Sequence, residues 1–110
     1  MAIYMYQFAY TPESWAAQLK NPENRIDNVG RASCEAAGGK LLGAWLSFGE
    51  YDAVLICDMP DEESMAGFAP AVAAGGALKL SKTTPLMTGT KGVEALKKAA
   101  RVAQVYRPAR

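Results

Sequence analysis

Three segments of this sequence have the composition of β-strands, yet both of their faces are apolar: residues 2–10, 40–48 and 53–58. A half-exposed strand alternates apolar and polar side chains with a period of two. In the first segment Ile3 and Met5 point to one face while Tyr4 and Tyr6 point to the other. A sheet built from such strands needs a covering layer on each face, and 110 residues are too few to supply both entirely.

The pairing of the second and third segments follows from the short link between them. Residues 49–52 are too few for a parallel crossover, so the two strands must form an antiparallel hairpin. Residues 77–84 predict a fourth strand. We expect Pro85 to stop it, because proline has no N–H to donate to a neighbouring strand.

Capping residues predict where the helices begin. Thr11 precedes Pro12 and opens a first short helix, and Asn21 precedes Pro22 and is expected to cap a second helix. Asp61 is the expected cap of a third helix, which Pro70 should kink or shorten. A final amphipathic helix is predicted over about residues 90–105, with Val93 and Leu96 on its apolar face.

The order of these elements predicts an α+β fold. It meets the ferredoxin-like βαββαβ arrangement, in which helices cover one face of a four-stranded antiparallel sheet, with a C-terminal helix added. The apolar open face predicts a homodimer or higher homo-oligomer, formed sheet to sheet about a two-fold axis. Alternatively, the C-terminal helix covers part of that face. We expect residues 1–106 to form a single domain and residues 107–110 a basic tail.

The composition excludes several kinds of chemistry. The chain has no histidine, so Ser-His-Asp and Cys-His catalysis and histidine-ligated metals are excluded. Cys34 and Cys57 are the two cysteines and are predicted to be free and buried. We predict no metal and no cofactor. A net charge of +1 and the lack of a membrane-spanning or secretory segment predict a cytoplasmic protein without nucleic-acid or membrane partners.

The turn at residues 49–52 supplies the first candidate site residues. Tyr51 could donate its phenolic hydroxyl to a ligand, and Asp52 could act as a catalytic base at the mouth of a pocket. The structural interpretation is that glycine and aspartate form a tight hairpin turn, in which the aspartate bonds the local backbone.

Other candidates lie on the fourth strand, a helix start and the second strand. Lys82 and Thr84 share one strand face, where Lys82 could act as a base or hold an oxyanion, or could simply be an edge-strand charge. Arg25 could bind an anionic ligand or form a structural ion pair. Trp45, with the other aromatic side chains, could line a ligand cavity or pack in the core or an interface.

Five blocks of the sequence resemble the GYD-domain family in order and spacing: residues 8–15, 21–25, 38–42, 48–52 and 82–86. The family takes its name from a Gly-x-Tyr-Asp stretch, matched by Gly49, Tyr51 and Asp52. The resemblance covers roughly residues 2–100 and implies a dimeric α+β barrel. That superfamily includes cofactor-independent monooxygenases, lactone isomerases and haem-handling enzymes, so the resemblance leaves the function open.

Two functional hypotheses follow. In the first, the protein is an oligomer that binds a small molecule, and it could be a cofactor-independent enzyme acting on a small apolar carbon acid. Its pocket would be edged by Tyr51, Asp52, Lys82 and Arg25, and these groups should then lie within about 10 Å of one another. In the second, the protein is a non-catalytic structural or regulatory oligomer with a filled interior.

Overall fold

The computed structural model describes residues 2–109. Two positions lie outside this range: Met1, the first residue of the predicted domain, and Arg110, the last residue of the predicted basic tail. These residues form four strands and four helices in this order: β1 (Ala2–Tyr10), α1 (Pro12–Lys20), α2 (Arg25–Ala36), β2 (Lys40–Leu46), β3 (Ala53–Met59), α3 (Glu62–Ala74), β4 (Leu78–Leu86) and α4 (Gly89–Ala103).

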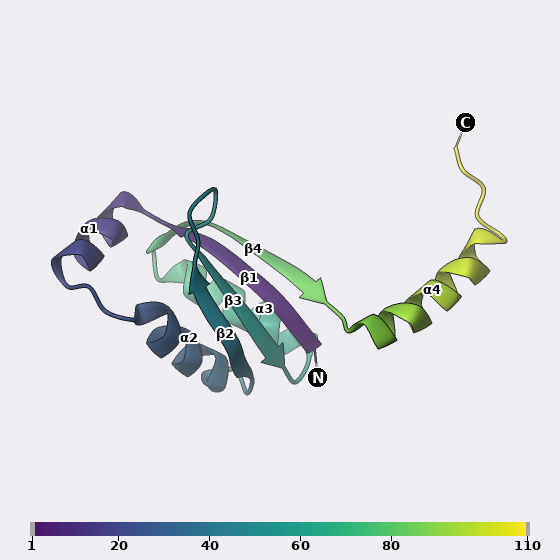
Figure 1. Ribbon diagram of the computed structural model, residues 1–110, viewed down its shortest axis with the longest axis horizontal. Coiled ribbons are helices and arrows are strands. Elements are labelled where there is room, and N and C mark those ends of the chain that lie inside the picture. The colour runs from purple at the N-terminus through teal and green to yellow at the C-terminus, as the bar shows by residue number, and fades with distance from the viewer. Residues whose placement is uncertain (1, 110) are drawn as a thin grey trace.

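The strands form one antiparallel sheet in the order β2-β3-β1-β4. This order and the two helices α2 and α3 on one face confirm the ferredoxin-like α+β fold (Figure 1). The predicted hairpin between β2 and β3 is also confirmed. Helix α2 packs on β2 and β3, whereas α3 packs on β3 and β4.

The core lies between the sheet and these helices and is rich in aromatic side chains. Tyr6 and Phe8 of β1 are buried there, and Phe68 of α3 packs on Tyr6 in an edge-to-face pair with ring centroids 5.3 Å apart. Tyr10 continues the row and makes a similar pair with Trp15 of α1. Alternate residues of β1 therefore point toward the helices, as a strand with a period of two requires.

The other sheet face carries the remaining residues of each strand, and no helix within residues 2–109 lies over it (Figure 1). Directly paired residues share a face, so Trp45, Val54, Gln7 and Lys82 form one row across the sheet from β2 to β4. Trp45 is 56% exposed in this row. We call this surface the open sheet face.

Two prolines behave differently from the sequence prediction. Strand β4 continues through Pro85, which pairs with Tyr4. Because β4 is an edge strand, the missing N–H is tolerated on its unpaired side. Helix α3 continues past Pro70 to Ala74, because Pro70 lies on the exposed side, where water can bond the carbonyl group left without a partner.

The helix caps agree with the sequence except at one position. Thr11 accepts a hydrogen bond from the Ser14 N–H and Asp61 accepts one from the Ser64 N–H, as predicted. The predicted cap Asn21 instead follows the end of α1, and Asn24 caps α2. Two residues separate these two asparagines, because the chain must turn between α1 and α2 before helical geometry resumes.

Helix α4 lies apart from the rest of the molecule. Figure 1 shows it projecting beyond the end of β4, which makes the molecule 58 Å long but only 22 Å thick. None of its residues is buried. The alternative in which this helix covers the open sheet face of its own chain is therefore wrong.

Candidate functional site

A cleft of about 620 Å³ separates α2 from α3 above the sheet. Its floor is aromatic, from Tyr6, Phe8 and Tyr10 of β1, and its walls are small or apolar side chains of the two helices. Gly30 of α2 and Gly67 of α3 also line the cleft, and a Cβ added at Gly67 would meet no atom within 4 Å, so the missing side chain leaves open space there. A cleft of this volume and lining falls in the range of small-molecule sites.

One end of the cleft gathers a cation and a phenol. Arg25, the first residue of α2, lines the cleft near Tyr10. Burial raises the pKa of Tyr10, while the nearby Arg25 guanidinium lowers it in part and the Asp52 carboxylate raises it. Within residues 2–109, Arg25 forms no ion pair and the Tyr10 hydroxyl makes no side-chain hydrogen bond. Both groups are therefore available to a ligand.

In the turn between β2 and β3, the candidate residues Tyr51 and Asp52 form hydrogen bonds that involve the backbone. The Tyr10 N–H donates to Oδ2 of Asp52 at 2.8 Å, and the Asp52 N–H donates to the Phe8 carbonyl at 2.8 Å. The carbonyl of Tyr51 accepts a hydrogen bond from the Ser47 hydroxyl. Asp52 thereby ties the turn to the end of β1, the structural use of aspartate in a turn.

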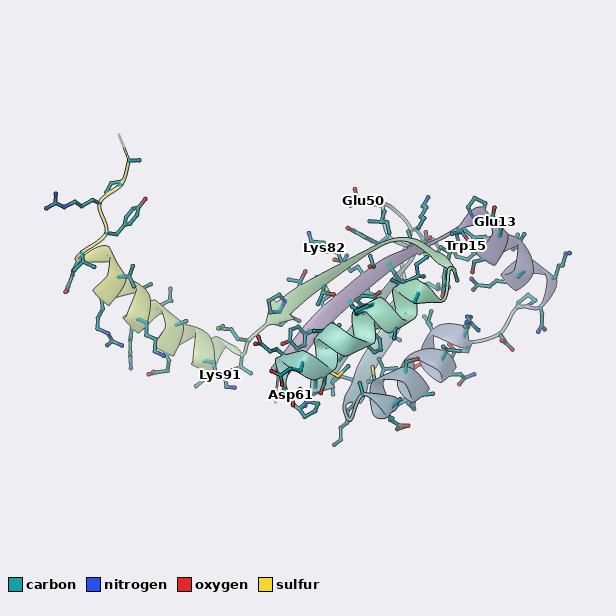
Figure 2. All side chains as sticks on the ribbon, turned by 180° about the vertical axis from the view of Figure 1, so that it is seen from behind. Glu13, Trp15, Glu50, Asp61, Lys82 and Lys91 are labelled. Atoms are coloured by element: carbon teal, nitrogen blue, oxygen red, sulfur yellow. The ribbon has the colours of Figure 1, made fainter. Side chains whose placement is uncertain are left out.

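The candidates on the strands lie on the open sheet face. Lys82 pairs with Gln7, on the side of β4 away from the helices (Figure 2). Thr84 pairs with Met5 and, two residues further along the strand, shares that side. Trp45 shares the row of Lys82, but three strand spacings place their Cα atoms about 14 Å apart. Lys82 and Thr84 lie two residues apart along one strand and so remain neighbours.

The structure therefore divides the predicted site. Arg25 lines the cleft on the helix side, whereas Lys82 projects from the opposite sheet face. Asp52 and Tyr51 lie in the turn at the sheet end and are not among the residues that line the cleft. Sequence reasoning missed the helix residues Ser33, Glu63 and Ser64, which complete the polar lining. No local sequence pattern marks these three residues as cleft residues, because they line one cleft only through the way α2 and α3 pack on the sheet.

The two cysteines meet in the core. Cys34 and Cys57 are free and fully buried, with sulfur atoms 3.4 Å apart. The hydrogen bond with Cys34 and burial both raise the pKa of Cys57, so this residue stays a thiol at neutral pH. Across residues 2–109 no group of three or more His, Cys, Asp or Glu side chains is arranged to hold a metal ion.

Comparison with known families shows to which family the chain belongs. The family model described as GYD domain matches residues 4–101. The chain belongs to the GYD-domain family. A search of the curated proteins found no match. Among the helices described in residues 2–109 of this GYD-domain protein, none is long and apolar enough to cross a membrane.

Solved structures similar to the GYD-domain protein share its fold at low sequence identity. MtbAldR aligns with a TM-score of 0.59 and 15% identity over 79% of this chain and 52% of its own, so the GYD-domain protein spans about half the length of MtbAldR. FFRP-DM1 aligns with a TM-score of 0.50 and 13% identity over 79% of this chain and 100% of its own. An uncharacterized NIPSNAP domain protein from Burkholderia xenovorans aligns with a TM-score of 0.50 and 17% identity, over 80% and 94%.

Replacing Asp52 of the Gly-x-Tyr-Asp stretch tests its structural role. Because Asp52→Ala leaves the part-buried Tyr10 N–H without its acceptor, we expect the free energy of unfolding to fall by about 1–3 kcal/mol. Glu50→Ala, in the same turn but exposed, is the control and should change it by less than about 0.5 kcal/mol. Urea unfolding followed by circular dichroism measures both. Equal effects of the two substitutions would contradict this role.

Proposed function

We propose that this GYD-domain protein binds a small, mainly apolar molecule bearing an anionic group in the cleft between α2 and α3. The observation that carries the proposal is the aromatic floor of a 620 Å³ cleft with Arg25 at its edge. The apolar part of the ligand would stack on Phe8 and Tyr10. Its anionic group would accept hydrogen bonds from the Arg25 guanidinium and the Tyr10 hydroxyl.

The other end of the cleft limits where the anionic group can lie. Glu63 and Ser64 come from the first turn of α3. This turn follows β3, and β3 runs antiparallel to β1, so it lies at the sheet end opposite Tyr10 and Arg25. The Glu63 carboxylate would repel an anion there. The charge distribution of the cleft thus favours one orientation of the ligand, with its anionic group beside Arg25.

Binding accounts for these positions better than catalysis by Asp52 or Lys82. The Asp52 carboxylate is engaged by the Tyr10 N–H, and Lys82 lies across the sheet from the cleft. A general base must lie within hydrogen-bond reach of the proton that it removes. A carbon-acid reaction in this cleft would therefore need a base other than these two residues.

A fluorescent probe of the proposed chemistry tests the cleft. 8-Anilinonaphthalene-1-sulfonate is aromatic and anionic, and we expect 2-naphthoate to displace it. Because Arg25→Gln removes a charged hydrogen-bond donor, it should weaken probe binding about tenfold or more. Gly67→Leu should also weaken binding, since a side chain there meets no atom within 4 Å and would fill the cleft.

Two control variants separate this cleft from other surfaces. Lys20→Gln removes an exposed cation outside the cleft and should leave the affinity unchanged. Trp45→Ser alters the open sheet face and should also leave it unchanged. If Trp45→Ser abolishes binding while Arg25→Gln and Gly67→Leu do not, the probe binds the sheet face and the proposed site is wrong.

We also propose that the protein is a homo-oligomer formed through the open sheet face, as both functional hypotheses from the sequence expect. Exposed apolar side chains on this face support it: Trp45 on β2, and Leu80 and Leu86 on β4. Surfaces of this kind usually mark interaction sites. Light scattering of the intact protein should give at least twice the 11.7 kDa of one chain. A mass of one chain at micromolar concentration would contradict the proposal.

A further inference from the structure

The cleft between α2 and α3 is long and has two distinct ends. Both Glu63, near the start of α3, and Gly75, which follows its last residue, line the cleft. The helical rise between these two positions is about 18 Å. In Figure 2, Asp61 marks one end of the helix layer and Trp15, which packs on Tyr10, marks the other. A molecule that reaches both ends is therefore elongated.

The polar groups at the Arg25 end are hydrogen-bond donors. The Arg25 guanidinium lines the cleft there, and a guanidinium donates up to five hydrogen bonds and accepts none. The Tyr10 hydroxyl beside it keeps its proton at neutral pH, because burial raises the pKa of Tyr10. This end therefore suits the anionic group of the ligand.

The polar groups at the opposite end are hydrogen-bond acceptors. The Ser64 hydroxyl donates its proton to Oδ1 of Asp61 at 2.7 Å, so only its oxygen lone pairs remain for a ligand. The Glu63 carboxylate forms no ion pair within residues 2–109, and an ionised carboxylate only accepts hydrogen bonds. A ligand group that donates several hydrogen bonds and accepts none is complementary to this end.

The net charge at this end is negative although a helix begins there. The start of α3 carries three acids, Asp61, Glu62 and Glu63. Hydrogen bonds from the hydroxyl and the N–H of Ser64 lower the pKa of Asp61, so its carboxylate is ionised at neutral pH. Three carboxylates outweigh the partial positive charge of a helix start, which is about half an elementary charge. A cationic group is therefore favoured beside Glu63.

Between its two ends the cleft is mainly apolar. Ile26 and Val29 of α2 face it from one side, and Ala71 and Val72 of α3 from the other. Ser33 of α2 is polar, but its hydroxyl donates to the Val29 carbonyl at 2.7 Å and has no proton left for a ligand. The middle of the ligand is therefore an apolar chain or ring system.

We infer that the ligand is an elongated apolar molecule with an anionic group at one end and a primary ammonium group at the other, in its simplest form an ω-amino acid. This inference rests on the proposed function, which places the anionic group beside Arg25, and it adds the group bound at the far end. An ammonium group has three donors and no acceptor, which matches the Glu63 carboxylate and the Ser64 oxygen. Contacts at both ends select the length and the orientation of the ligand.

Calorimetric titration of the intact protein with matched ligands, below the concentrations at which they form micelles, tests the ammonium contact. 12-Aminododecanoate and 12-hydroxydodecanoate have the same chain and differ only in the terminal group. We expect the amino compound to bind about fivefold more tightly, a modest preference because Glu63 is exposed. Glu63→Gln should remove this preference. Glu62→Gln, in the same helical turn but outside the lining of this cleft, is the matched control and should keep it.

Ligand length and charge reversal give two further measurements. 6-Aminohexanoate is too short to reach both ends, so it should bind no more tightly than 6-hydroxyhexanoate. Glu63→Lys should invert the order of the long ligands, so that dodecanedioate binds more tightly than 12-aminododecanoate. Because Glu63 is exposed, both of its variants should keep the circular dichroism spectrum of the wild-type protein.

The outcomes separate this inference from the proposed function. If the amino and hydroxy compounds bind equally and Arg25→Gln weakens both, the ammonium contact is overturned and the anion site stands. If Arg25→Gln changes the affinity of neither compound, the anion site and the inference both fail. A preference for the amino compound that persists in Glu63→Gln would also overturn the inference, because the ammonium group would then lie elsewhere.

Discussion

Truncation of Tyr6 to alanine is expected to lower the free energy of unfolding by about 3–5 kcal/mol, as for other large aromatic residues removed from a core. Tyr6 is fully buried at the centre of β1. Its ring packs on Phe8 and Phe68, with centroids 5.7 Å and 5.3 Å away. The neighbours cannot collapse into the space, because Phe8 is held by the sheet and Phe68 by α3. Chemical unfolding monitored by circular dichroism measures the change.

Tyr6→Phe is the matched control, since it removes the hydroxyl group and keeps the ring. The hydroxyl oxygen is buried and has no hydrogen-bond partner within residues 2–109. Burial raises the pKa of Tyr6, because the charged phenolate is disfavoured away from water. Removing an unpaired polar atom should leave the stability unchanged or raise it by about 1 kcal/mol. A loss as large as that of Tyr6→Ala would show that the hydroxyl is bonded after all.

Gly39→Ala is expected to destabilise the protein by about 3 kcal/mol, at the upper end of the range for overpacking. A Cβ atom at this position would lie 2.6 Å from the Asp58 carbonyl oxygen and 2.5 Å from Sδ of Met59. The methionine sulfur can move, but the carbonyl belongs to β3 and cannot shift without disturbing the sheet. Gly38, just before it, has φ of +86° and completes the turn from α2 into β2.

Gly49→Ala is the control for this substitution. Gly49 has no atom within 4 Å of its added Cβ and no positive φ, so its replacement should change the stability by less than about 0.5 kcal/mol. Thermal and urea unfolding of both variants give the comparison. If Gly39→Ala is as stable as Gly49→Ala, the contact between the α2–β2 turn and β3 is looser than the structure shows.

Most of the secondary structure could be predicted because its causes are local. The hairpin follows from the short link before Ala53, which is six residues long because β2 ends at Leu46, and the caps Thr11 and Asp61 act on N–H groups three residues away. The errors at Pro70 and Pro85 have one origin. The effect of a proline depends on whether its side of the helix or strand is exposed, and that exposure depends on tertiary packing.

The candidate site was less predictable, because its residues come from elements distant in sequence. Lys82 and Thr84 were expected to share a face, and they do. Whether that face also meets Arg25 depends on the strand order and on the side that the helices cover. The structure separates them by the thickness of the sheet, and it joins Arg25 to Tyr10, which the sequence marked only as one member of the aromatic set.

The doubly apolar strands were determined by the sequence alone, because strand periodicity depends on neighbouring residues. They require a covering layer on each face. Only the tertiary structure decided which face the helices cover, that α2 and α3 leave a cleft, and that α4 stands away from its own sheet. These outcomes depend on contacts between elements far apart in the chain, whose packing no local pattern encodes.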